Sequence, residues 1–175
     1  MIIEPVTVEP GPAIEQDSGS PQSGGPRRKG ELMISVERSM VIGRPAGEVV
    51  RYLADFGNTV EWDPGTVACV RLGPGPLVVG ARWRNTSRFR GRQTDLDYRL
   101  EEYGPARLVF VGHNRTVTAT DDITVRATEG RTLVVYRASL HFHGLARLAA
   151  PFLRAEFERL ANAVAERLPR VLAKR

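Results

Sequence analysis

Two adjacent aspartates, Asp121 and Asp122, lie in a run of alternating apolar residues and could supply acid–base chemistry. Successive side chains of a strand point to opposite faces, so one of the two carboxyls must face inward unless a bulge intervenes. Val117, Ala119 and Ile123 share the phase of Asp121, which directs Asp121 toward the interior. A desolvated carboxyl has a raised pKa and can act as a general acid or base. The alternative, a bulge or a salt bridge at the sheet edge, is the interpretation that the residues alone favour.

Aromatic and small polar side chains share one face of the strands predicted over residues 81–90, 94–103 and 132–142. The opposite face of the first of these strands carries arginines, which are hard to bury, so it should be the outer, convex face. An aromatic concave face with a few small polar groups is typical of a cavity for an apolar ligand with one or two oxygen atoms. The alternative is a solid core. The residues on this face are Trp83, Asn85, Ser87, Phe89, Tyr98, Tyr136 and Phe142.

Other site chemistries find little support. The histidines His113, His141 and His143 come without a cysteine cluster, so we expect no zinc site and no cofactor. The outer arginines lie beside Asp95 and Asp97 of the next strand, which favours a cross-strand charge ladder over a nucleic-acid surface. A Gly91-Arg92 hairpin loop would place Arg88 opposite Asp95.

The elements that position these residues follow from periodicity and turn signals. A strand precedes Gly43, and a helix begins after Pro45, with Val49, Val50, Leu53 and Phe56 at helical spacing. Short strands separated by turns then favour an antiparallel meander. Besides the three strands above, they are predicted over residues 66–72, 107–113 and 116–127.

A long terminal helix is predicted from about Ala146 to Arg167, with possible extension past Pro169. Its amphipathic stripe recurs every three or four residues. A curved sheet and one helix must bury each other, because each has a single apolar side. The pattern therefore predicts an α+β fold. The stripe consists of Leu153, Phe157, Leu160, Val164 and Leu168.

The segment Arg38 to Pro64, RSMVIGRPAGEVVRYLADFGNTVEWDP, has the order strand, short helix, second break and W-D-P. In this order it resembles the start of the START-like (SRPBCC) superfamily, of polyketide cyclase/dehydrase and lipid-transport type. The resemblance implies a helix-grip fold: a curved antiparallel sheet wrapped around a long C-terminal helix, with two short helices after the first strand. It also implies an internal ligand cavity with the W-x-P segment near its mouth. Trp62 is therefore a candidate ligand contact, or alternatively a residue that staples this segment to the sheet.

Composition bounds the chain as one ordinary domain of 175 residues with a net charge of +5. Residues 1–30 are rich in Pro, Gly and Ser and are predicted to be a disordered extension; residues 31–175 are the START-like domain. We expect a cytoplasmic protein without integral membrane association. The start of the chain has no secretory pattern, Cys69 is its single cysteine, and no apolar run approaches the roughly 20 residues of a spanning helix.

These observations predict that the protein binds a small hydrophobic or aromatic ligand, lipid-like or polyketide-like, and not nucleic acid. One alternative is a polyketide aromatase/cyclase or dehydratase that uses the same cavity, with Tyr98, Tyr136 and Asp121 as acid–base candidates. Another is a protein-interaction module that uses the basic outer face. The sequence predicts neither the ligand's identity nor the oligomeric state. The candidate ligand-binding residues are Trp62, Trp83, Asn85, Ser87, Phe89, Tyr98, Asp121, Tyr136 and Phe157.

Overall fold

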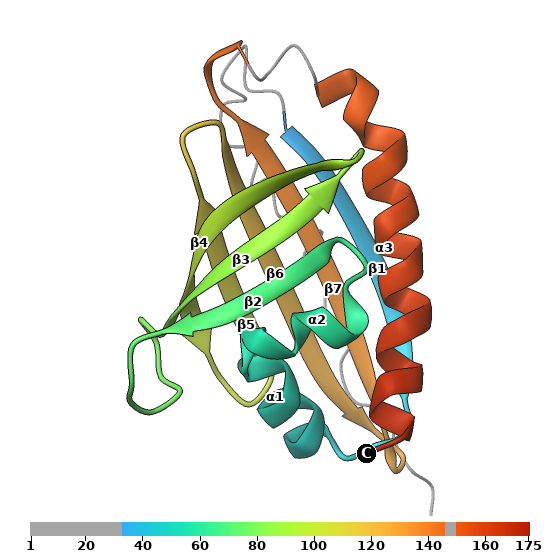
Figure 1. Cartoon of the computed structure of the whole chain (residues 1–175). Coiled ribbons are helices and arrows are strands. Elements are labelled where there is room, and N and C mark those ends of the chain that lie inside the picture. Colours follow the sequence, from blue (N-terminus) through green and yellow to red (C-terminus); the bar gives the residue numbers. More distant parts are fainter. Residues whose placement is uncertain (1–32, 146–149) are drawn as a thin grey trace, which may run out of the picture.

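The computed structural model describes residues 33–145 and 150–175, so the predicted extension over residues 1–30 lies outside the described residues. The described chain forms one curved antiparallel sheet with a long helix laid along it (Figure 1). The strands are β1 (Met33–Ile42), β2 (Thr66–Leu72), β3 (Arg82–Phe89), β4 (Arg92–Tyr103), β5 (Arg107–His113), β6 (Val117–Thr128) and β7 (Arg131–Phe142). The helices are α1 (Ala46–Ala54), the 3-10 turn η1 (Phe56–Asn58), α2 (Thr59–Trp62) and α3 (Ala150–Ala173).

The strand order β1-β7-β6-β5-β4-β3-β2 confirms the predicted meander and the α+β helix-grip fold. Strands β2 to β7 pair in sequence order, because their short connections allow only antiparallel neighbours. β1 instead pairs with β7 over its whole length, from Met33 opposite His141 to Ile42 opposite Thr132. The short helices between β1 and β2 therefore lie beneath the bent sheet, between its two edge strands (Figure 1).

The segment between β1 and β2 forms two short helices, as the resemblance implied. Pro45 precedes the first turn of α1, where its missing N–H has no intrahelical partner to lose. Val49 and Leu53 of α1 are fully buried. The Asp55 carboxylate then accepts a hydrogen bond from the Gly57 N–H at 3.0 Å and begins η1. These contacts hold α1 and η1 against one end of the concave face.

The β3–β4 hairpin differs from its predicted register. Its two-residue loop is Arg90-Gly91, with φ of 48° and 78°, because a turn with two positive φ angles favours glycine at its second position. Arg88 therefore lies opposite Gln93, and Asp95 opposite Thr86. The register moves by two residues, which keeps every side chain on its predicted face.

The outer face carries cross-strand ion pairs, as the charge-ladder interpretation predicted. Arg84 contacts Asp97 at 2.9 Å, and Arg137 contacts Glu37 on the neighbouring edge strand at 2.5 Å. Exposed pairs of this kind contribute little to stability, about 0–1 kcal/mol each. Their main consequence is that several of the outer arginines already have acidic partners.

Helix α3 runs from Ala150 to Ala173 and continues through Pro169. The predicted start over residues 146–149 lies outside the described residues. Val164 and Leu168 of the stripe are buried, and the extension adds buried Leu172. Leu153 and Phe157 at the other end are only partly buried. The helix thus packs tightly near its C-terminal end and less tightly near its N-terminal end.

An aromatic cluster fills the end of the core that lies above α1 and η1. The Phe56 ring packs on Tyr98 and Phe110 with centroids 4.4 and 4.5 Å apart. The Trp83 ring meets Phe110 edge-on at 5.8 Å, and its N–H donates to Asp55 at 3.2 Å. This end of the molecule is solid. At the other end only α3 covers the sheet.

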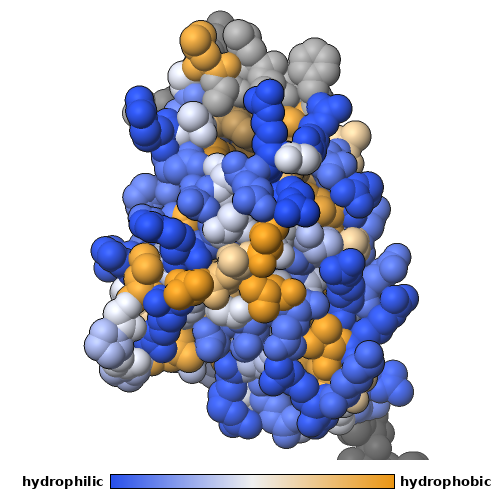
Figure 2. Space-filling model, viewed as in Figure 1, coloured by the Kyte–Doolittle hydropathy of each residue, from blue (hydrophilic) through white to orange (hydrophobic). Residues whose placement is uncertain are grey.

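The edge strand β2 exposes apolar side chains to solvent. Figure 2 shows apolar surface over this strand and the loop that follows it, where Val67, Val70, Val78 and Val79 are between 44% and 62% exposed.

Among the described residues, no helix is both long and apolar enough to cross a membrane.

We expect Leu168→Ala to lower the free energy of unfolding by about 2–5 kcal/mol, because this side chain is 2% exposed beneath α3. Urea unfolding measures the change. Arg170→Ala on the exposed side of the same helix, which removes only a loose pair with Glu166 at 3.7 Å, should change stability by less than about 0.5 kcal/mol. Equal effects of the two substitutions would contradict the packing of α3 on the sheet.

Candidate functional site

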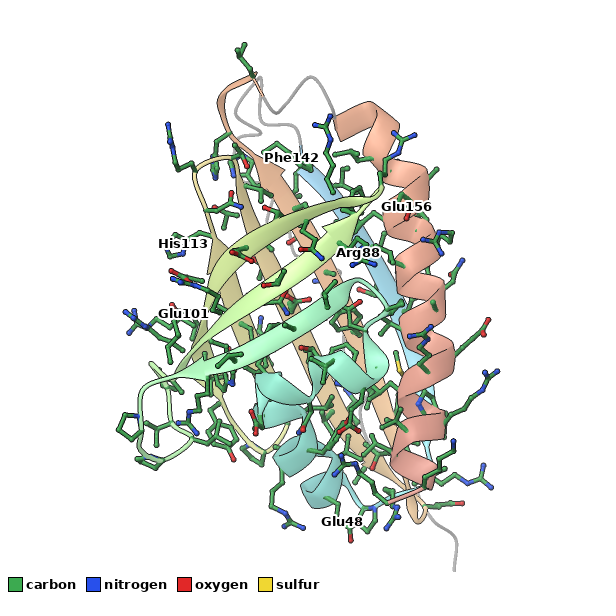
Figure 3. The ribbon with its side chains drawn as sticks, in the orientation of Figure 1. Glu48, Arg88, Glu101, His113, Phe142 and Glu156 are labelled. Carbon is green, nitrogen blue, oxygen red and sulfur yellow. The ribbon has the colours of Figure 1, made fainter. Side chains whose placement is uncertain are left out.

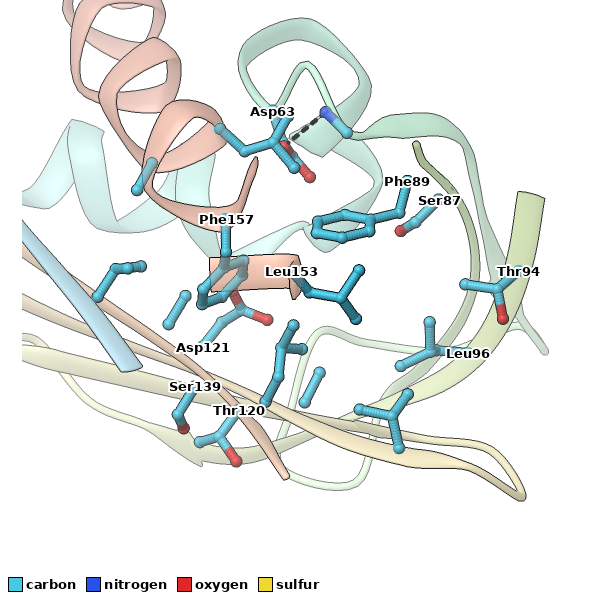
Figure 4. A pocket seen from close by; sticks show the side chains of 18 of the residues that line it. Asp63, Ser87, Phe89, Thr94, Leu96, Thr120, Asp121, Ser139, Leu153 and Phe157 are labelled. Atoms are coloured by element: carbon cyan, nitrogen blue, oxygen red, sulfur yellow. Dashed lines mark hydrogen bonds between the residues drawn. The ribbon is translucent and has the colours of Figure 1, made fainter. Parts of the chain in front are cut away.

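A cavity of about 620 Å³ lies between the concave face of the sheet and the N-terminal half of α3 (Figure 4). Its size is in the range that small-molecule sites occupy. The sheet contributes apolar residues of β1, β4, β6 and β7, and α3 contributes Leu153, Phe157, Leu160, Ala161 and Val164. Polar side chains also line the cavity, among them Asp63, Ser87 and Asp121. The predicted residues on its wall are Ser87, Phe89, Tyr98, Asp121, Tyr136 and Phe157.

Asp121 is 7% exposed and faces the cavity, as its phase in the strand predicted. β6 pairs with β5 and β7 without a register shift at this position, so the two adjacent aspartates point to opposite faces. Asp122 lies on the outer face, where Arg107 donates two hydrogen bonds to it at 3.0 and 2.9 Å. The interpretation that we favoured from sequence, a bulge or an edge salt bridge at Asp121, is therefore wrong. The salt bridge belongs to Asp122.

Two tyrosines donate hydrogen bonds to the buried carboxyl. The Tyr136 hydroxyl donates to Asp121 Oδ1 from the adjacent strand, and the Tyr98 hydroxyl also bonds to Asp121. Burial raises the pKa of Asp121 to about 6, and the two hydroxyls limit the rise because they stabilise the charged form. Burial and the nearby carboxyl raise the pKa values of both tyrosines, so their protons stay in place.

Asp63 is a second carboxyl on the cavity wall, and it was not among the site residues predicted from sequence. It ends α2 and accepts hydrogen bonds from the Gly65 N–H at 2.9 Å and the Thr66 hydroxyl at 2.6 Å. Burial raises the pKa of Asp63, and its charge contributes to the raised pKa of Asp121. The signal was present: Asp63 stands two residues before a glycine, which is typical of an aspartate that caps its own turn.

A chain of hydrogen bonds leads from the cavity to Asp63. The Ser87 hydroxyl donates to Asn85 Oδ1 at 2.6 Å, and the Asn85 amide donates to Thr66 Oγ1 at 3.1 Å. The Thr66 hydroxyl then donates to Asp63. Each donor points toward the carboxylate and away from the cavity. The direction of all three hydrogen bonds is set by the Asp63 carboxylate at the end of the series, because an ionised carboxylate accepts hydrogen bonds and cannot donate them.

Gly112 gives Tyr98 the space to reach Asp121. It lies directly opposite Tyr98 on β5, and a Cβ atom there would come within 2.5 Å of the Tyr98 ring. A side chain at this position must therefore displace the ring. No local sequence pattern marks this glycine, because its role depends on cross-strand pairing.

Three predicted site residues lie outside the cavity wall. Trp62 is 2% exposed and packs edge-on against Tyr136, with ring centroids 5.9 Å apart and, within the described residues, no hydrogen-bond partner for its N–H. Trp83 belongs to the aromatic cluster at the solid end. Asn85 is buried behind Ser87. Trp83 and Asn85 point inward as predicted, but Phe56 packs against Trp83 and Thr66 accepts a hydrogen bond from Asn85. Trp62, which the resemblance implied near the mouth, is instead buried against Tyr136, in agreement with the stapling alternative.

The mouth of the cavity lies between the β3–β4 hairpin and the first turns of α3. Phe89 and Leu153 stand at its two sides (Figure 4), and Phe142 lies at the end of β7 (Figure 3). Arg88, Arg90 and Arg92 of the hairpin line it as well. On α3, Glu156 bonds Arg159 at 2.6 Å, and Arg90 adds to the lowering of the pKa of Glu156. The cavity wall is thus basic at the mouth, whereas its two carboxyls, Asp63 and Asp121, lie inside.

The histidines lie apart from the cavity. The His141 and His143 rings are 4.9 Å apart, and Thr118 shares a hydrogen bond with His143 at 2.9 Å. His113 is exposed at the end of β5 (Figure 3). In the described part of the chain no three His, Cys, Asp or Glu side chains gather as metal ligands would.

The model of the family described as "Polyketide cyclase / dehydrase and lipid transport" matches residues 33–173. The chain belongs to this family. The match covers every strand and α3, and so includes both carboxyls and both tyrosines of the cavity. Comparison with curated protein sequences finds no match.

Solved structures share the fold at low sequence identity. A START superfamily protein from Mycobacterium smegmatis has a TM-score of 0.65 at 12% identity, over 80% of this chain and 97% of that one. The Zhui aromatase/cyclase from Streptomyces sp. R1128 has a TM-score of 0.62 at 16% identity, over 80% and 91%. Ara h 8.0201 has a TM-score of 0.60 at 10% identity, over 82% and 99%. At these identities the likeness establishes the fold alone.

We expect Asp121 and Asp122 to contribute to the free energy of unfolding with opposite dependences on pH. The raised pKa of Asp121 means that the folded state binds the extra proton, so its contribution is present below about pH 4 and is lost as pH rises through about 6. Each pKa unit corresponds to about 1.4 kcal/mol, so the loss is at most about 3 kcal/mol. Asp121→Asn should remove this fall from urea-unfolding curves measured between pH 4 and 8.

Asp122→Asn is the matched control. Arg107 lowers the pKa of Asp122, so its contribution is present at neutral pH and is lost as pH falls through the folded-state pKa, below its ordinary value. A wild-type curve that does not fall between pH 4 and 6 relative to Asp121→Asn would contradict the burial of this carboxyl.

Proposed function

We propose that the protein binds a small hydrophobic or aromatic ligand in the cavity between the sheet and α3. The observation that carries this proposal is the cavity itself, about 620 Å³ of space walled mainly by apolar and aromatic side chains. A domain of this size normally packs its interior without voids larger than a water molecule. A cavity this large must be supported by the surrounding structure, and its apolar wall favours an apolar occupant.

The fold explains how such a space persists without collapse. One end of the core is closed by the aromatic cluster, and Leu168 and Leu172 anchor α3 to the sheet at the same end. The other half of α3 spans the concave face with partly buried Leu153 and Phe157. These two side chains are positioned to contact a ligand and to cover it. Family membership agrees with this function, because its description includes lipid transport.

Filling the cavity tests the proposal. Nile red, a neutral apolar fluorophore, should bind the native protein with a saturable rise in fluorescence. Ala161→Trp places a large side chain in the cavity and should lower this affinity at least tenfold, with little loss of thermal stability because the space is already present.

Ala155→Trp is the matched control, since Ala155 is exposed on the same helix. It should leave Nile red binding within about twofold. If Ala161→Trp instead destabilises the protein by more than about 3 kcal/mol and Nile red does not saturate, the interior is solid and the proposal is wrong.

A second candidate function, polyketide cyclisation or dehydration in the same cavity, is favoured by the pKa of about 6 for Asp121. A carboxyl that titrates near neutral pH can remove a proton from a carbon beside a carbonyl group and return it to a leaving hydroxyl. Tyr98 and Tyr136 would hold the carboxyl in place. A similar fold in proteins described as aromatase/cyclases is consistent with this chemistry.

The test is turnover of a poly-β-ketone substrate, with the cyclised or dehydrated product measured by mass spectrometry. Asp121→Asn should lower the rate about 100-fold or more, because general acid–base catalysis typically contributes that much. Asp122→Asn on the outer face should not change it. Binding of the substrate without turnover by the wild-type protein would leave ligand binding as the function and exclude this one.

A further inference from the structure

The polar groups that face the interior of the cavity are turned so that they accept hydrogen bonds and do not donate them. The hydrogens of Tyr98 and Tyr136 are used by Asp121. The hydrogen of Ser87 is used by Asn85, at the start of the chain that ends on Asp63. A tyrosine or serine oxygen whose hydrogen is engaged keeps lone pairs for a ligand. The two carboxylates, when ionised, are acceptors only.

The other hydroxyls on the cavity wall leave this pattern intact around Asp121. Thr120 and Ser139 lie on the strands beneath it, and their hydroxyls point away from the cavity (Figure 4). Thr116 donates its hydrogen to Asn114 Oδ1 at 3.0 Å. Thr94 accepts from the Asn114 amide at 3.1 Å and so keeps its own hydrogen, but it lies near the hairpin and away from Asp121 (Figure 4). The interior around Asp121 is therefore a wall of acceptors, whose hydroxyl donors have been directed into the protein by two acidic groups.

Acidic and basic groups occupy different parts of the cavity wall. From each element packed around Asp121, the titratable groups are Asp63 after α2, Tyr98 on β4 and Tyr136 on β7. α3 faces it with Phe157, Leu160, Ala161 and Val164, which are apolar. Among the described residues, the basic side chains on the cavity wall are Arg88, Arg90 and Arg92, and all three belong to the hairpin at the mouth. The interior is negative and has its cations at the entrance.

We propose that the ligand is a hydrophobic molecule that carries a protonated amine, which pairs with Asp121 inside the cavity. This inference rests on the proposed function, since it names the class of ligand for the same site. An ammonium group supplies several donors to the part of the wall around Asp121, which offers acceptors. It also supplies the positive charge that a buried carboxylate otherwise lacks, and charge-assisted hydrogen bonds are the stronger kind. A ketone or a carboxylate would meet lone pairs or negative charge there.

Three probes with the same ring system test the choice: 2-(1-naphthyl)ethylamine, 2-(1-naphthyl)ethanol and 1-naphthylacetate. At pH 8 the amine should bind ten- to a hundredfold more tightly than the alcohol, and the carboxylate should bind most weakly. Isothermal titration calorimetry on the full chain measures all three. Because protonation of Asp121 removes its charge, amine affinity should fall at least tenfold as pH is lowered from 8 to 5, whereas affinity for the alcohol should change less than threefold.

Asp121→Asn should reduce amine affinity at least tenfold and alcohol affinity less than threefold. Asp122→Asn, one residue away on the outer face, should alter neither. Equal affinity for amine and alcohol at pH 8, or an amine affinity that does not change with pH, overturns this inference. The pH series uses the unmodified protein, so it decides the question even if Asp121→Asn folds poorly.

Nile red separates the two proposals. If Nile red binds and Ala161→Trp weakens its binding, but the amine binds no more tightly than the alcohol, the proposed ligand binding stands and the inference of an amine ligand is wrong. If neither Nile red nor any naphthyl probe binds, the proposed function is overturned, and this inference with it.

Discussion

The packing of one helix against one strongly bent sheet is the constraint on which the rest of this structure depends. The concave face is longer than the apolar stripe of α3 can fill, so other elements must close part of it. α1, η1 and the Phe56 cluster close one end, and Leu168 and Leu172 anchor the helix there. The remaining volume lies under the less tightly packed half of α3. The cavity is therefore a result of how the two layers meet.

Within that cavity, two carboxyls, Asp63 and Asp121, set the orientation of the neighbouring hydrogen-bond donors. Asp121 takes the hydrogens of two tyrosines, and Asp63 directs the donors that extend from Ser87. Gly112 contributes by leaving room for the Tyr98 ring. Buried carboxyls are costly unless they are hydrogen-bonded, and here these hydroxyl and amide donors reduce that cost. The consequence for recognition is that the cavity presents acceptors and negative charge, although its walls are mostly apolar.

The outer face of the sheet is governed by different physics. Its arginines and acids form exposed pairs such as Arg84 with Asp97, which high dielectric and salt weaken. These pairs keep the convex face soluble and favour the strand pairing that they span. The contrast between Asp121 and Asp122 illustrates the difference: neighbouring residues of one type have pKa values displaced in opposite directions, one by burial and the other by a guanidinium.

Local sequence patterns were enough to predict the layers of this protein. The period of two in the strands, the period near 3.6 in α3 and the turn residues between them predicted the α+β fold, the strand order from β2 to β7 and the face of almost every side chain. These are local properties, because a side chain's direction depends on its own backbone. The hairpin register was wrong by two residues yet left the faces intact for the same reason.

Which of the inward-facing residues border empty space depends on how distant segments pack together. Trp83 and Ser87 share a face of β3, but Phe56 packs against Trp83, whereas Ser87 borders the cavity. Phe56 belongs to η1, in the segment between β1 and β2, so its position cannot be read from the sequence of β3. Asp63 and Asp121 are far apart in the chain and meet only because α2 lies under the sheet. The period of a sequence gives the direction in which a side chain points, but not its distance from residues across the core. The cavity and the proximity of its two carboxyls therefore follow from packing between distant segments.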